Sequence, residues 1–178
     1  YVQIAVPANT QVFYTTDGAD PTQNSNPYNG EQLELNFTTV LRARAFSTGD
    51  IRPSDILTGT YFINTYHSLP LVSVVTDPDN LWNKETGMLV TGDNVFKEPG
   101  QLPFKNTVYR KVKDSGVKNE VHVELYHDSG TKLIDQDCCF SLMGDFSLDM
   151  PQKSFKFRAK SKYGAKTFAA KLFPDRPY

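Results

Sequence analysis

The sequence predicts a mainly β protein, with an N-terminal β-sandwich followed by a second, β-rich α+β part. Three observations predict this class. The 178 residues contain 14 Asp against 6 Glu and 16 Thr against 9 Ala, and Asp and Thr favour turns and strands whereas Glu and Ala favour helices. Apolar and polar residues alternate over short segments, which is the period of a half-buried strand. Turn residues separate these segments, and no long amphipathic helix is predicted.

Residues 1–63 are predicted to form the first domain, a small β-sandwich. In the segment 40–47, Leu and Ala side chains occupy one face and two arginines occupy the other. The densest turn signal, Asp-Gly-Ala-Asp-Pro, lies at residues 17–21, where Gly tolerates a positive φ and Pro fixes its own. The predicted strands of this domain are 2–6, 12–16, 33–35, 40–47 and 57–63.

Residues 64–178 are predicted to form the second domain, which begins where the alternation weakens. Asp77 and Pro78 predict the start of a short helical turn at 77–82, and Gly and Pro residues predict a loop at 93–106. Asp135 and Asp137 are assigned to a turn before a strand. The predicted strands of this domain are 71–75, 121–126, 138–143 and 155–160.

Charge and composition exclude several function classes. The 19 Lys and Arg nearly balance the 20 Asp and Glu, so the net charge of -1 predicts no nucleic-acid partner and no binding to an anionic membrane. No run approaches the roughly 18 apolar residues of a transmembrane helix. The adjacent Cys138 and Cys139 are expected to serve in packing, since neighbouring cysteines bridge poorly.

The histidines do not predict a metal site. His67, His122 and His127 lack metal-ligand spacing, although His122 and Glu124 share one face of a predicted strand. We therefore expect no metal ligands in this chain.

The first domain carries a recognisable set of motifs. FYTTDGADPT at 13–22, PYNG at 27–30 and LRARAF at 41–46 resemble the fibronectin-type-III-like module named after the C-terminal domain of chitobiases and β-hexosaminidases. The resemblance implies an immunoglobulin- or fibronectin-like β-sandwich without catalytic residues. It also implies attachment to a secreted or surface-anchored bacterial protein, and hence an extracellular or cell-surface location.

The second domain has its own resemblance. LPLVSVVTDPDNLWNKETGMLVTGDN at 69–94, EVHVELYHDSGTKLIDQDC at 120–138 and GDFSLDMPQKSFKFRAKSKYG at 144–164 resemble the N-terminal part of the CotH family. These are spore-coat proteins with a divergent protein-kinase-like fold. The resemblance spans residues 69–175 and implies that the domain continues past Tyr178, with the acidic metal and base residues lying in that continuation.

The CotH resemblance implies a set of phosphate-binding residues. A phosphate-covering loop would include Gly144 and Ser147, and the cations would come from Lys153, Lys156 and Arg158. The sequence CFSLMG at 139–144 departs from the family's Gly-Ile-Arg-Ile-His-Gly and lacks its arginines, which removes bidentate phosphate donors. We expect no cofactor in this chain, whereas ATP and magnesium would belong to a longer parent.

Aromatic residues supply an alternative. Sugar-binding modules stack pyranose rings on exposed aromatic side chains. Such a carbohydrate-binding platform is predicted from Trp82, Tyr66, Tyr109 and Tyr126.

Three functional hypotheses follow. The first is a non-catalytic fragment of a secreted or surface-anchored bacterial protein, the second is the ATP-binding part of a CotH-type atypical kinase, and the third is a carbohydrate-binding accessory module. The expected partner is a glycan or a cell-surface protein. Truncated sheet edges also predict a homodimer, because a truncated second domain would leave apolar groups uncovered at Phe168, Leu172 and Phe173.

Overall fold

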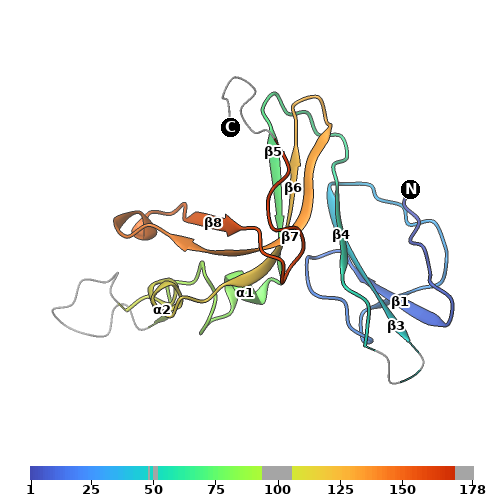
Figure 1. Cartoon of the computed structure of the whole chain (residues 1–178), viewed down its shortest axis with the longest axis horizontal. Helices are drawn as coiled ribbons and strands as arrows, with labels where there is room; N and C mark the ends of the chain where they lie inside the picture. Colours follow the sequence, from blue (N-terminus) through green and yellow to red (C-terminus); the bar gives the residue numbers. More distant parts are fainter. Residues whose placement is uncertain (48, 50–51, 94–105, 171–178) are drawn as a thin grey trace.

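The computed structural model describes residues 1–47, 49, 52–93 and 106–170, which form two antiparallel four-stranded sheets (Figure 1). The first sheet has the order β2-β1-β3-β4. Its strands are β1 (Thr10–Thr15), β2 (Asn26–Tyr28), β3 (Thr39–Ser47) and β4 (Leu57–Tyr61). The second sheet has the order β5-β6-β7-β8. Its strands are β5 (Leu71–Val75), β6 (Asn119–Tyr126), β7 (Lys132–Met143) and β8 (Ser154–Arg158).

The helical segments are short and belong to the second sheet's side of the molecule. They are α1 (Asp79–Trp82), α2 (Val108–Asp114) and the 3-10 helix η3 (Phe146–Asp149). None of the described helices is long and apolar enough to cross a membrane. The mainly β class predicted from the sequence is therefore confirmed.

The first sheet differs from the prediction at both of its weakest segments. Residues 2–6 and 33–35 form a single isolated bridge between Val2 and Leu33 instead of two strands, because most of the segment 2–6 is exposed and contributes little apolar burial to hold a longer ladder. The strand β2 was not among the predicted strands of this domain. Tyr28 decides this pairing, since its side chain is buried and its hydroxyl donates to the Glu31 carbonyl.

The second sheet also corrects the predicted elements. Asp135 and Asp137 lie inside β7, opposite Glu124 and His122 of β6, and not in a turn. The helix α2 had not been predicted, although Tyr109 and Val112 have helical spacing and are both buried. The predicted loop at 93–106 lies mostly outside the described residues.

Two apolar clusters hold the sheets. The smaller one packs Val12, Tyr28 and Ala43 in the first sheet. The larger one packs the inner face of the second sheet against α2 and η3, with Phe140 at 1% exposure between the rings of Phe155 and Phe157. Its buried members are Met88, Tyr109, Val112, Val121, Val123, Cys138, Phe140, Leu142 and Leu148.

The cysteines and the aromatic residues near the C-terminus can be placed relative to this larger cluster. Cys138 and Cys139 are both buried and unbridged, and burial raises the pKa of the Cys138 thiol to about 11, so this side chain is an unreactive packing group. Phe168 packs against the same cluster. It is partly buried there, whereas Leu172 and Phe173 lie outside the described residues, and the homodimer stays a prediction.

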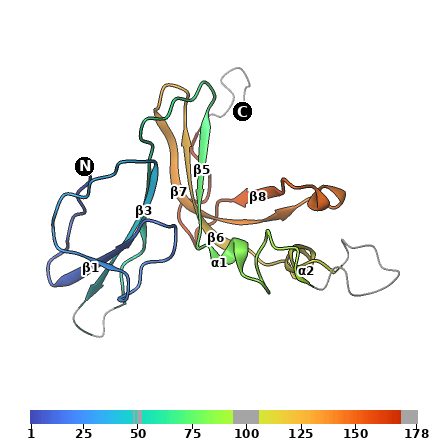
Figure 2. The same cartoon turned by 180° about the vertical axis from the view of Figure 1, so that it is seen from behind.

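The two sheets meet along β4 and the β6–β7 hairpin, and the view from behind shows the same arrangement (Figure 2). The Thr60 amide of β4 donates to Oε2 of Glu124 at 2.9 Å, and the hydroxyls of Thr60 and Ser73 lie 2.7 Å apart. The Asp20 amide donates to Asp77 at 3.2 Å. The contact between the sheets is therefore largely polar.

Replacing Phe140 by alanine tests the larger cluster. We expect Phe140→Ala to lower the free energy of unfolding by about 3–5 kcal/mol, because it removes a buried ring and leaves a cavity. Urea unfolding midpoints of the parent and the variant measure this loss. Phe37→Ala is the control, since Phe37 is 73% exposed, and an equal loss in both variants would contradict the assignment.

Candidate functional site

Three of the residues predicted to bind phosphate or sugar gather in one pocket of about 380 Å³. Trp82, Tyr109 and Lys153 line it together with Asp149. We call it the Trp82 pocket, and its full lining is Trp82, Leu89, Thr91, Tyr109, Asp149, Pro151 and Lys153. The lining combines an aromatic face with one cation, one carboxylate and the hydroxyls of Thr91 and Tyr109.

A different segment of the chain positions each wall of this pocket. Asp77 accepts the Asp79 amide and starts α1, which ends at Trp82 with its indole 61% exposed. The helix α2 buries Tyr109 in the apolar cluster. The chain leaving β7 forms η3 and brings Asp149 to the Tyr109 hydroxyl at 2.8 Å.

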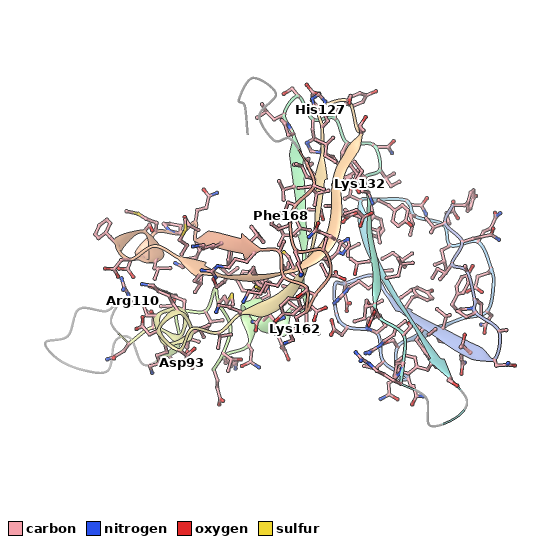
Figure 3. The ribbon with its side chains drawn as sticks, in the orientation of Figure 1. Asp93, Arg110, His127, Lys132, Lys162 and Phe168 are labelled. Atoms are coloured by element: carbon pink, nitrogen blue, oxygen red, sulfur yellow. The ribbon has the colours of Figure 1, made fainter. Side chains whose placement is uncertain are left out.

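An ion network fixes the floor of the Trp82 pocket. Arg110 of α2 donates to Asp149 at 2.8 Å and to Asp145 at 3.1 Å, so it ties η3 to α2 (Figure 3). Burial would raise the pKa of Asp149, but the bonds from Arg110 and Tyr109 together lower it below its ordinary value. Burial and the Asp149 carboxylate raise the pKa of Tyr109. Asp149 is thus held as a carboxylate beside a neutral phenol.

Lys153 lies above this network. Its ammonium donates to the Met150 carbonyl at 2.8 Å and lies 4.3 Å from the centre of the Tyr109 ring. Burial lowers the pKa of Lys153, and the nearby Asp149 opposes that shift. The ammonium is therefore positioned by a carbonyl and an aromatic face at the edge of the pocket.

The other predicted phosphate ligands lie elsewhere. Gly144 has φ +103°, and the Ser147 hydroxyl occupies the space that a Cβ on Gly144 would need. The Ser147 side chain therefore fills the space beside Gly144 in this loop. Lys156 and Arg158 alternate along β8 with the core residues Phe155 and Phe157, and so lie on the opposite face from the cluster. The five residues thus lie around η3, at the edge of the Trp82 pocket and along β8, and their phosphate role stays a prediction.

The two remaining aromatic candidates line a second groove of about 500 Å³. Tyr66 is fully exposed there, whereas the ring of Tyr126 packs edge-on against Phe62 at 5.2 Å. We call it the Tyr66 groove. Its lining is Thr60, Tyr61, Phe62, Ile63, Thr65, Tyr66, His67, Leu71, Tyr126, His127, Asp128, Ser129 and Gly130. The four predicted sugar-binding residues therefore form two separate pairs, and their role stays a prediction.

A buried polar network lies between these sites, where the β6–β7 hairpin faces β4. Glu124 has 0% side-chain exposure, and its oxygens accept from Lys132 at 2.6 Å, from Tyr126 at 2.9 Å and from the Thr60 amide at 2.9 Å. Burial would raise the pKa of Glu124, but these three donors lower it. Burial and the Glu124 carboxylate raise the pKa of Tyr126 to about 12. The alternation of His122, Glu124 and Tyr126 was visible in the sequence, but their burial was not.

Metal-ligating atoms also meet in this network. Ligand atoms of His122, Glu124 and Asp135 all lie within 4.8 Å of one another. His122 and Asp137 also line a polar cleft of about 350 Å³ between the sheets, next to Arg42 and Asp20 of the first sheet. Sequence reasoning missed the cluster because Asp135 had been assigned to a turn.

Comparison with known proteins identifies the first module alone. The family model of the chitobiase/beta-hexosaminidase C-terminal domain matches residues 1–58, which confirms the resemblance of the first module to this accessory β-sandwich domain. No curated protein and no solved structure matches the chain. The resemblance of residues 69–175 to the CotH family stays a prediction.

The pH dependence of the free energy of unfolding tests the role of Asp149 at the floor of the Trp82 pocket. The folded pKa of Asp149 lies below its ordinary value of about 3.9, so its contribution is fully present above that value and is lost as the pH falls through the folded pKa. We expect Asp149→Asn to lower the free energy of unfolding by about 1–3 kcal/mol at pH 7.

The difference between Asp149→Asn and the parent should shrink as the pH falls below about 4. Urea unfolding at pH 7 and at lower pH measures it. Asp114→Asn, which changes an exposed carboxylate, should shift stability by less than about 0.5 kcal/mol at both. A pH-independent loss in Asp149→Asn would show that the carboxylate's charge is not what matters.

Proposed function

We propose that this chain is a non-catalytic accessory region of a secreted or surface-anchored bacterial protein. In this proposal residues 1–63 are a chitobiase-type β-sandwich module, and residues 64–178 are the opening part of a CotH-like domain. The observation that carries it is the family match over residues 1–58, which covers β1, β2 and β3 and ends at the start of β4. The polar contact from Thr60 to Glu124 then attaches this module to the second sheet.

The charges of the η3 loop, where the kinase hypothesis places the phosphate-covering loop, support the non-catalytic assignment. A phosphate-covering loop presents backbone amides and cations to an anion. Here the η3 loop presents Asp145 and Asp149, and Arg110 is bonded to both of them. Two carboxylates at this position oppose the approach of phosphate groups.

An ATP assay tests this assignment. Incubated with magnesium and ATP, the chain should show no ATP turnover and no protein phosphorylation above a heat-denatured sample. Lys153→Ala and Lys118→Ala form the matched pair, because Lys118 is exposed and lies outside the predicted phosphate set. A magnesium-dependent signal that Lys153→Ala abolishes and Lys118→Ala retains would overturn the non-catalytic assignment.

We further propose that the accessory region binds a glycan, with the Trp82 pocket as the sugar-binding site. An exposed indole offers a face on which a pyranose ring can stack. Asp149 and Thr91 offer acceptors, and Lys153 offers a donor, at the edge of that face. This combination of an apolar face with a few fixed polar groups is what sugar recognition requires.

Glycan-array and polysaccharide pull-down experiments test the sugar-binding site. We expect Trp82→Ala to weaken binding about 2- to 12-fold, since an aromatic stacking contact is worth about 0.5–1.5 kcal/mol. Tyr66→Ala, in the other groove, is the comparison and should bind as the parent does. Binding lost only in Tyr66→Ala would reject the Trp82 pocket, and no binding by the parent would reject the glycan hypothesis.

A further inference from the structure

The polar face of the β6–β7 hairpin contains one group that the hydrogen-bond network does not satisfy. His122 is 8% exposed, and its Nδ1 lies 2.8 Å from Oδ1 of Asp137. On the other side of the ring, Nε2 lies 3.1 Å from Oδ1 of Asp135, yet it makes no hydrogen bond to any part of the chain that the structure describes. Buried polar atoms are nearly always satisfied, so this nitrogen points to a ligand.

The Asp137 contact determines which atoms of the ring are available. A carboxylate only accepts hydrogen bonds, so Nδ1 carries a proton and donates it to Asp137. The other ring nitrogen, Nε2, lies 3.1 Å from Oδ1 of Asp135 without forming a hydrogen bond to it. Since Nδ1 is engaged by Asp137, Nε2 is the ring atom left to bind a ligand. A carboxylate behind a metal-binding histidine is the usual way of orienting such a ring.

The charges around His122 also favour a cation. Glu124, Asp135 and Asp137 contribute three negative charges, and Lys132 contributes one positive charge through contacts of 2.6 Å to Glu124 and 2.7 Å to Asp135. The three carboxylates and the one ammonium therefore leave an excess of two negative charges before the His122 ring is counted. A divalent ion would neutralise this excess.

We propose that His122, Glu124 and Asp135 bind a divalent transition-metal ion of the zinc class at the junction of the two sheets. Their ligand atoms already lie within 4.8 Å of one another, and ligand–metal distances of about 2.0–2.2 Å bring such atoms slightly closer. Asp135 is half-exposed, so its side chain can rotate to close the site. The imidazole ligand favours zinc-class ions over calcium and magnesium, which prefer oxygen.

The proposed ion would act on the contact between the sheets. Glu124 accepts the amide of Thr60 on β4, so an ion held by Glu124 would be linked to the first sheet through that carboxylate. Lys132 occupies the space between Glu124 and Asp135 and is 35% exposed, so its ammonium can move into solvent when an ion binds. Figure 3 shows Lys132 where the hairpin faces the first sheet. This proposal is independent of the glycan and kinase hypotheses.

Zinc binding to the whole chain tests the proposal. After treatment with EDTA and dialysis, equilibrium dialysis should give one Zn²⁺ per chain. At a hundred-fold excess over its Kd, Zn²⁺ should raise the Tm by about 5 °C or more, and Ca²⁺ should not. Zn²⁺ that leaves the Tm unchanged, or Ca²⁺ that raises it equally, would overturn the proposal.

Single substitutions locate the ligands. His122→Gln and Asp135→Asn should abolish the Zn²⁺-induced rise in Tm, and Asp137→Asn should weaken Zn²⁺ binding about 10–100-fold through the orientation of the ring. Lys132→Met should bind Zn²⁺ at least as tightly as the parent, because it removes the competing ammonium.

His127→Gln is the matched control, because His127 lies at the exposed tip of the same hairpin (Figure 3). It should leave the Zn²⁺ response unchanged. An unchanged response in His122→Gln, or a response lost only in His127→Gln, would overturn the assignment. If a ligand variant does not fold, the visible absorption of Co²⁺ bound to the parent still tests it, since only an ion with protein ligands shows intense tetrahedral or five-coordinate bands.

Discussion

The arrangement of the two sheets depends on the buried carboxylate of Glu124. Removing a carboxylate from water is costly unless hydrogen-bond donors replace the water. Here three donors replace the water: the Thr60 amide of β4, the Tyr126 hydroxyl of β6 and the Lys132 ammonium of β7. All three must be in position together, so the satisfied carboxylate fixes β4 against the β6–β7 hairpin.

The hairpin can serve this contact because its two faces differ. Val121 and Val123 of β6 face the apolar cluster, whereas His122 and Glu124, which alternate with them, face the first sheet. A strand with one apolar and one polar face is usually half exposed. In this chain His122 and Glu124 on the polar face are buried as well, so the Glu124 carboxylate is matched by specific donors and not by water.

The Trp82 pocket is organised from the apolar cluster outward. Tyr109 is buried in that cluster and orients Asp149 through its hydroxyl, while Lys153 lies over its ring. Arg110, the next residue on α2, holds the η3 loop through Asp145 and Asp149. The polar groups beside the exposed indole of Trp82 are thus positioned by packing and not by the loop alone, which is what a preorganised binding site needs.

The sequence by itself determined the β class, the turn at residues 17–21 and the accessory module, because alternation and turn residues are local signals. It also named Trp82, Tyr109 and Lys153, but under two different hypotheses. Only the tertiary structure brought these three together with Asp149, since α1, α2 and the chain after β7 are distant in sequence. The register of β6 against β7 likewise decided that Asp135 faces His122 and Glu124. The register of two strands depends on all of their paired residues. The acidic residues at 135 and 137 alone therefore did not show whether this segment forms a strand or a turn.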